Sequence, residues 1–295
     1  MDYLSRYSVK EVIKPLSERK PIELEAEKIP KISVITASFN QGQFLERTIL
    51  SVINQNYSNT EFIIIDGGST DNTLEIIEKY KNYITYWVSE KDNGQSDAIN
   101  KGFKIATGDL LCFQNSDDLF CLNSFKLLSA FYKINPNFDI YFGDLLFVDA
   151  NDDTLEILKT SNFDIRSQIL EGMQVFNQSM YFKKSLGEEH GYLDESLRFV
   201  LDYENILRWA QNGAKLAKIR HLMGAFRIHE DAKTNNLQDV RRTEHEAVKA
   251  RYFNLLFPNK RPSKLVYLLL RVKKLLYFIL NSDFGYIKYR YSLKK

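Results

Sequence analysis

The chain has little of what marks several common protein classes. Its 295 residues hold two cysteines, Cys112 and Cys121, which are too few for a disulfide framework and lack the spacing of a zinc site. No G-x-G-x-x-G follows the first predicted strand and no G-x-x-x-x-G-K-[ST] occurs, which disfavours nicotinamide dehydrogenases and P-loop NTPases. The N-terminus lacks the apolar core of a signal peptide. We therefore expect a globular protein of a reducing, cytoplasmic compartment.

Charge is distributed unevenly along the chain. Residues 251–295 hold eleven lysines and arginines against one acid, Asp283, a local net charge of +10. Because the whole chain carries +2, residues 1–250 carry −8. A basic tail on an acidic body predicts an anionic surface as the partner of the tail.

Short apolar runs alternate with helical patterns in the first 120 residues, which predicts parallel strands joined by helices in a doubly wound α/β sheet. The predicted strands are 32–37, 61–65, 84–88 and 110–113, and the predicted helices are 43–55, a segment that ends near residue 80, and 96–106. Beyond them we expect helices at 124–135, near 200–212 and at 235–256, strands at 140–142, 177–182 and 223–228, and a hairpin at 151–153.

Polar or acidic side chains follow each of the first four strands. In an open parallel sheet, this carboxyl edge is where ligands bind. The adjacent acids Asp117 and Asp118 suit a hard cation such as Mg²⁺ held together with substrate phosphates. A solvated turn or a helix N-cap is the alternative for this stretch, because aspartate favours both. An edge rich in carboxylates repels a bare phosphate, so we expect a nucleotide here to arrive with a metal.

Four motifs, taken in order, resemble the family 2 glycosyltransferases with a GT-A fold. They are SVITASFNQG at 33–42, IIDGGSTD at 64–71, DAINKG at 97–102 and NSDD at 115–118. With a later segment near residue 202, the resemblance covers roughly residues 30–235. It implies a Rossmann-like, mostly parallel central sheet flanked by helices. It also implies inverting transfer of a sugar from a nucleoside diphosphate with Mn²⁺ or Mg²⁺.

The resemblance implies a role for each matching residue. Asp66 would accept a hydrogen bond from the base, which favours a UDP-sugar, although guanine also offers N–H donors. Asn115 stands where the first acid of the family's D-x-D often stands, which leaves strict metal dependence open. The implied nucleotide-binding residues are Thr36, Ser38, Asn40, Asp66, Lys91, Asp97, Asn115 and Ser116. The implied metal ligands are Asp117 and His229, with Asp118 as a further candidate, and the implied donor- or acceptor-sugar contacts are Gln178 and Arg227.

Asp202 is the predicted catalytic base. It stands at the start of a predicted helix, where an N-cap is the ordinary role of an aspartate. The family places its general base in such a segment, and an acceptor hydroxyl needs a positioned carboxylate to take its proton. Glu204 is the alternate, two residues on and therefore on another side of the helix.

The sequence predicts a leader at 1–30, a GT-A catalytic domain at 31–235 and a helical, basic C-terminal extension at 236–295. The catalytic domain would comprise a nucleotide-binding half, 31–120, and an acceptor-binding half, 121–235. The apolar stretch 265–280 is too short and too charged to span a membrane. Residues 262–295 could instead contact a membrane surface. A helix packed on the catalytic domain and an oligomer contact are the alternatives.

We therefore predict an inverting, hexosyltransferase-type enzyme of glycan or polysaccharide biosynthesis. It would serve a saccharide or lipid-linked saccharide acceptor in the cytoplasm, peripherally on the inner face of the cell membrane, and without nucleic acid. Oligomeric state stays open. The alternatives are a non-catalytic or nucleotidyltransferase-like GT-A protein, and a module that docks on membrane or nucleic acid through its basic tail. Nucleotidyltransferases typically carry a glycine-rich loop with arginine after the first strand, and SFNQG at 38–42 lacks that arginine.

Overall fold

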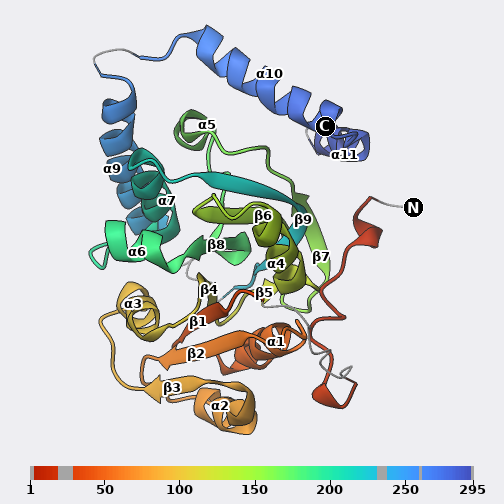
Figure 1. The fold of residues 1–295 in the computed structure, drawn as a ribbon, viewed down its shortest axis with the longest axis vertical. Helices are drawn as coiled ribbons and strands as arrows, with labels where there is room; N and C mark the ends of the chain where they lie inside the picture. Colours follow the sequence, from red (N-terminus) through yellow and green to blue (C-terminus); the bar gives the residue numbers. More distant parts are fainter. Residues whose placement is uncertain (1–2, 19–28, 231–237, 259–260, 294–295) are drawn as a thin grey trace.

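The computed structural model describes residues 3–18, 29–230, 238–258 and 261–293. Figure 1 shows a central sheet with helices on both sides and a C-terminal helical segment across one end of the molecule. Predictions for residues 19–28 of the leader, for the domain boundary at 235/236 and for the last two lysines lie outside these residues.

The strands, in chain order, are β1 (Ile32–Ser38), β2 (Thr60–Asp66), β3 (Tyr86–Ser89), β4 (Leu110–Asn115), β5 (Leu119–Phe120), β6 (Ile140–Val148), β7 (Thr154–Leu158), β8 (Met180–Lys183) and β9 (Leu216–Arg227). The helices are α1 (Gly42–Ile53), α2 (Thr73–Tyr80), α3 (Gln95–Ile105), α4 (Ser124–Ile134), α5 (Ile165–Leu170), α6 (Lys184–His190), α7 (Leu201–Gln211), α9 (Gln238–Leu256), α10 (Lys264–Leu280) and α11 (Phe284–Ser292).

One sheet runs through the described chain in the order β3-β2-β1-β4-β8-β6-β9-β5, with β7 paired to β6. Strands β3, β2, β1 and β4 are parallel, so the predicted doubly wound α/β unit is confirmed. Beyond β4 the sheet becomes mixed, because β8 runs antiparallel to both β4 and β6. The carboxyl ends of the first four strands therefore meet at one edge.

The first strands are apolar on both faces because helices cover both faces. Val34 of β1 packs in the core cluster that includes α1 and α2, whereas Ile35 packs in the cluster that includes α3. Helix α3 lies so close to β1 that a Cβ on Gly102 would come within 2.4 Å of the Ile35 side chain. Glycine at this position is therefore required by the packing.

The segment predicted as one strand over 177–182 is a 3-10 turn, Asn177–Ser179, followed by β8. This turn packs against β9, where a Cβ on Gly224 would lie 1.8 Å from the Gln178 carbonyl oxygen. The turn, rather than a strand, sets the position of Gln178. Strand β9 is also longer than predicted and begins at Leu216, because its first half pairs with β6.

The N-terminal leader and the C-terminal helices pack together against the sheet. Val9 and Val12 share a buried cluster with Phe278 and Tyr286, and with residues of β6 and β7. The ring of Tyr3 stacks on that of Tyr289 at 4.9 Å between centroids. Across the described ranges, no helix combines the length and the apolar character needed to cross a bilayer.

Candidate active site

A cleft of about 1100 Å³ opens at the carboxyl ends of β1 and β4. One part of its wall is polar and comes from the loops that follow β1, β3 and β4. Another part is apolar and comes from β6, β9 and the segment after α5, with α7 and α9 adding further side chains. The polar wall includes Ser38, Asp92, Gln95, Asn115, Ser116 and Asp117, and the apolar wall includes Leu145, Phe147, Met173, Phe176 and Phe226.

Asp117 and His229 form a pair beside the cleft. The Nε2 atom of His229 lies 3.0 Å from Oδ2 of Asp117, and Phe44 packs against the imidazole with 4.3 Å between ring centroids. Asp117 lines the cleft, with its side chain 21% exposed. One carboxylate and one imidazole are a donor set that fits a divalent ion whose other positions are filled by diphosphate oxygens. No group of three or more such ligands occurs within the described residues.

Asp118 points inward, although it is adjacent to Asp117. Its carboxylate accepts hydrogen bonds from the Arg227 backbone N–H at 2.9 Å, the Asn115 side chain at 2.9 Å and the Gln178 side chain at 2.8 Å. Burial, and then the neighbouring charge of Asp117, raise the pKa of Asp118 to about 8. Its position corrects the expectation of a second metal carboxylate, because Asp118 holds the turn together instead.

Arg227 supports the same turn from behind and is fully buried. Its Nε donates to the Asp117 carbonyl oxygen at 2.7 Å, and its guanidinium pairs with Asp152. Desolvation lowers the pKa of Arg227, and Asp152 opposes that shift. Arg227 does not line the cleft. This corrects the expectation of a sugar contact, since the guanidinium is held by Asp152 and the Asp117 carbonyl behind the cleft.

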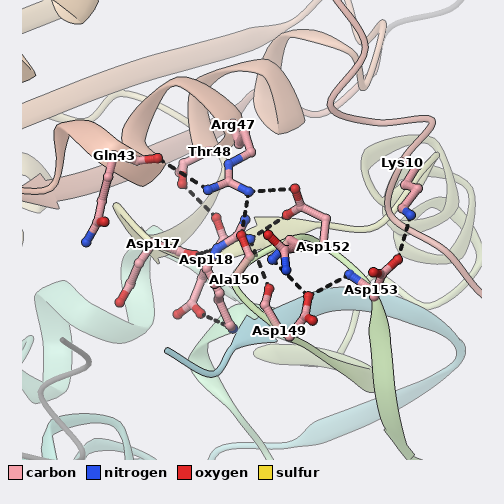
Figure 2. Close-up of polar contacts among 12 residues, drawn as sticks. Lys10, Gln43, Arg47, Thr48, Asp117, Asp118, Asp149, Ala150, Asp152 and Asp153 are labelled. Atoms are coloured by element: carbon pink, nitrogen blue, oxygen red, sulfur yellow. Dashed lines mark hydrogen bonds and ion pairs between the residues drawn. The ribbon is translucent and has the colours of Figure 1, made fainter. Parts of the chain in front are cut away.

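The hairpin between β6 and β7 completes this support. Arg47 of α1 donates to Asp152 at 2.7 Å and to the Ala150 carbonyl at 2.8 Å, and Figure 2 shows this contact beside Asp117 and Asp118. Thr48 donates to the carbonyl oxygens of Ser116 and Asp118. The sequence predicted the hairpin, but nothing in it indicated that Arg47 and Asp152 would meet under the acidic turn.

Asp66 braces its own loop and is completely buried. Its carboxylate accepts from the backbone N–H of Gly68 and Ser69 and from the hydroxyls of Ser69 and Ser89. With these partners it does not line the cleft, which corrects the expectation of a direct contact with the base. Asp92 lines the cleft instead, packed so close to Gly67 that a Cβ there would lie 2.6 Å from its Oδ2.

The other predicted nucleotide contacts divide into two groups. Ser38, Asn115 and Ser116 line the cleft. Thr36, Asn40, Lys91 and Asp97 do not. Asn40 accepts from the Thr70 N–H at 2.8 Å, Asp97 accepts from the Asn93 N–H at 2.9 Å, Thr36 is buried in β1, and Lys91 is exposed.

The Asn93 bond has an electrostatic consequence. Donation from this N–H is the main cause that lowers the pKa of Asp97. Asn40 and Asp97 therefore shape the loops that carry the lining residues, rather than the lining itself.

Helix α7 presents Asp202 to the cleft and turns Glu204 away from it. Asp202 lies in the first turn, partly buried, and accepts the Tyr203 N–H at 2.9 Å. Desolvation raises its pKa to about 6, against the lowering effect of backbone N–H groups. Such a group is charged at neutral pH and still able to take a proton. Gln178 lines the cleft as well.

Glu204 is buried and fully engaged on the far side of α7. Arg208 donates to both of its oxygens at 3.2 Å, and the Tyr252 hydroxyl of α9 donates at 2.8 Å. It does not line the cleft. The alternate base is therefore a structural ion pair that fastens α7 to α9, which leaves Asp202 as the carboxylate of α7 that faces the cleft.

The chain is similar to several known proteins in sequence and in fold. A Mycobacterium tuberculosis (strain ATCC 25618 / H37Rv) protein described as an uncharacterised glycosyltransferase is 34% identical over 188 residues, which cover 61% of this chain and 69% of the relative. The structure of S. aureus TarS in complex with UDP-GlcNAc superposes with a TM-score of 0.61 at 17% identity, covering 76% of this chain and 72% of that chain. The mannosyltransferase PcManGT from Pyrobaculum calidifontis in complex with GDP-Man and Mn²⁺ gives 0.58 at 16% identity, covering 88% and 72%.

The fold is therefore that of a GT-A-like glycosyltransferase, as the strand-end motifs predicted. The pattern of Glycosyl transferase family 2 matches residues 33–188, which is more than half of the chain. The chain belongs to that family.

Proposed function

We propose that this enzyme is an inverting glycosyltransferase of hexosyl type. It takes a sugar from a nucleoside diphosphate, UDP being favoured, and transfers it to a hydroxyl of a saccharide or lipid-linked saccharide. The observation that carries the proposal is that Asp117, backed by His229, and Asp202 line one cleft. Such a cleft has a place for a metal-bound diphosphate and a separate carboxylate for the incoming hydroxyl.

The reaction is a single displacement. Asp202 accepts the proton of the acceptor hydroxyl as the hydroxyl oxygen forms a bond to the anomeric carbon. The bond between that carbon and the diphosphate oxygen breaks, and its electron pair leaves with the diphosphate. Attack opposite to the leaving group inverts the anomeric configuration.

Asp117 and His229 are the residues that would hold Mn²⁺ or Mg²⁺. When bound, the ion supplies positive charge for the departing diphosphate. The structural neighbour PcManGT is in complex with GDP-Man and Mn²⁺, and TarS with UDP-GlcNAc, which supports a metal and a nucleotide sugar as a class. Asn115 donates to Asp118 and accepts from Gln95 at 2.7 Å. Asn115 therefore orders the turn that carries Asp117 without adding a negative charge.

We assign recognition of the nucleotide base to Asp92 instead of Asp66. Asp92 lines the polar wall of the cleft and is half-buried, whereas the Asp66 carboxylate is fully used within its loop. An aspartate oxygen can accept the ring N–H of uracil. The expected setting is the inner face of the cell membrane, because a lipid-linked acceptor is presented at a membrane surface.

Release of nucleoside diphosphate tests the proposal. Purified enzyme is incubated with UDP-glucose, UDP-N-acetylglucosamine and GDP-mannose in turn, with and without Mn²⁺, and with pooled lipid-linked saccharides as acceptors. We expect acceptor-dependent release from one donor, slowed by at least about 100-fold in Asp202→Asn, and a product of inverted anomeric configuration by NMR. Acceptor-dependent release at the wild-type rate in Asp202→Asn, or a retained configuration, contradicts the mechanism.

A further inference from the structure

Helix α10 presents a long apolar stripe to solvent. Its members recur at intervals of three and four residues and are between 40% and 81% exposed. They are Leu265, Leu268, Leu269, Val272, Leu275, Leu276, Ile279 and Leu280. At about 100° per residue they cover roughly 140° of the helix surface. So large a continuous apolar surface marks an interaction site.

The opposite side of α10 is attached to the protein. Leu270 and Phe278 are buried, and Phe278 belongs to the cluster that includes the leader and α11. Just beyond the helix, Asp283 pairs with Lys159 at 2.6 Å. The orientation of α10 is therefore fixed, with the stripe turned away from the body.

Cations border both edges of the stripe. On the helical wheel, Lys264 and Arg271 lie along one edge and Lys273 along the other. No acid occurs in α10. If two copies of the chain paired through their stripes, these like charges would be brought together, which disfavours the pairing. An anionic lipid surface instead complements both the apolar stripe and its basic edges.

We propose that α10 binds an anionic membrane surface in the plane of the interface. The stripe enters the boundary between headgroups and acyl chains, and Lys264 contacts lipid phosphates at one edge, while Arg271 and Lys273 keep their ion pairs with Glu171 and Asp164. This assigns residues and an orientation to the membrane contact, and it rests on the proposed use of a lipid-linked acceptor for its biological purpose.

The attachment of α10 relates the stripe to the cleft. Lys273 pairs with Asp164 at 2.8 Å, at the start of α5, and Arg271 pairs with Glu171 at 3.6 Å, just after α5. Figure 1 shows α10 above α5, near the top of the view. The segment that follows α5 brings Met173 and Phe176 into the apolar wall of the cleft. A membrane-bound α10 would hold this wall near the lipid surface.

Vesicle binding of the full-length protein tests the proposal. The probe is co-sedimentation with vesicles of phosphatidylcholine, with and without about 30% phosphatidylglycerol. We expect binding to the anionic vesicles that weakens with salt. The triple variant Leu269→Gln, Val272→Gln, Leu276→Gln should bind at least about tenfold more weakly, because its apolar contact with lipid is lost.

The matched control places three equal changes at exposed apolar positions of other elements, Ile134→Gln, Leu155→Gln and Leu255→Gln, and it should bind like wild type. Melting temperature and nucleotide binding are measured on every variant. Loss of vesicle binding with both unchanged in the stripe variant supports the proposal. Equal vesicle binding by wild type and stripe variant overturns it. The proposal is also overturned if wild type does not bind vesicles and is instead a dimer, as is the control, while the stripe variant is a monomer.

The assay contains neither donor nor acceptor. Failure of vesicle binding therefore leaves the glycosyltransferase proposal standing, and inactivity in transfer leaves the membrane proposal standing.

Discussion

The turn after β4 and the first turn of α7 each hold one acid inside the protein, but with different partners. Each carries two nearby acids, and in each one acid faces the cleft while the other is turned inward. After β4, the inward Asp118 is held by uncharged N–H and amide donors, and burial raises its pKa to about 8. In α7, the inward Glu204 is held by the charged Arg208.

The difference shows how partners decide the role of a carboxylate. A buried acid among neutral donors can keep a proton, whereas a buried acid beside arginine has a charged partner. The two outward acids differ as well. Asp117 has His229 at 3.0 Å and suits a metal. Asp202 faces the cleft at a pKa of about 6 and suits proton transfer.

The largest effect is expected from removing the outward acid of α7. Asp202→Asn keeps the shape and removes the proton acceptor, so kcat should fall by about 10²–10⁴-fold. The affinity for nucleoside diphosphate, measured by calorimetry, should stay within a factor of about two of wild type. The reason is that Asp202 takes the proton of the acceptor hydroxyl and does not bind the donor. A parallel loss of nucleotide affinity would instead assign Asp202 to the donor site.

Asp117→Asn removes the negative charge offered to a metal. We expect kcat/KM for the donor to fall by about 100-fold, since stabilisation of the leaving diphosphate is worth several kcal/mol. Raising the Mn²⁺ concentration should restore part of the loss, which a titration of rate against metal would reveal. Treatment of wild type with a chelator should abolish transfer, and added Mn²⁺ should return it. Full activity in the chelated wild type would show that transfer does not need a metal.

The pH profile separates the two outward acids. Burial raises the pKa of Asp202 to about 6, and the base acts in its deprotonated form, so kcat should fall about tenfold per unit as pH drops below 6. Above 6 the base is charged and this limb should be flat. In Asp117→Asn, kcat should still fall as the pH drops below about 6. In Asp202→Asn, the residual kcat should not show this fall. A limb of equal position in Asp202→Asn would assign the titration to another group.

Changing the inward acid of α7 should have the smallest effect on rate. Glu204→Gln should leave kcat within a factor of about three, because Glu204 does not line the cleft. Stability should fall by about 1–3 kcal/mol, since Arg208 loses its charged partner. Thermal or urea unfolding measures the second effect. A large fall in kcat without a change in stability would reverse the assignment of the two acids.

Much of this arrangement could be predicted from the sequence. Apolar runs that end in polar residues gave β1, β2 and β4 and the edge that carries the site, because periodicity and burial are local properties. Asp117, Asp202, Ser38, Asn115 and Ser116 were predicted as site residues, and all of them line the cleft.

The inward residues could not be separated from the outward ones in this way. Asp118 turns inward because it accepts a hydrogen bond from Gln178, which lies 60 residues further along the chain. Arg227 turns inward because it donates to Asp152 and to the Asp117 carbonyl oxygen, which are 75 and 110 residues away in the sequence. Asp66 was expected at the base and braces its loop, because Ser89 on the neighbouring strand completes its hydrogen bonds. Such long-range partners leave no mark in local sequence.

The melting temperature in the presence of nucleotides shows whether Asp117 holds a metal-dependent donor site. Wild type and Asp117→Asn are heated with UDP, GDP, dTDP or CDP, each with and without Mn²⁺. Ligand that binds the native state raises the melting temperature by mass action. We predict that one nucleotide, UDP being favoured, raises the melting temperature, and that this rise requires Mn²⁺ and disappears in Asp117→Asn. A rise that is equal in Asp117→Asn, or the absence of a rise with every nucleotide and metal, would contradict this prediction.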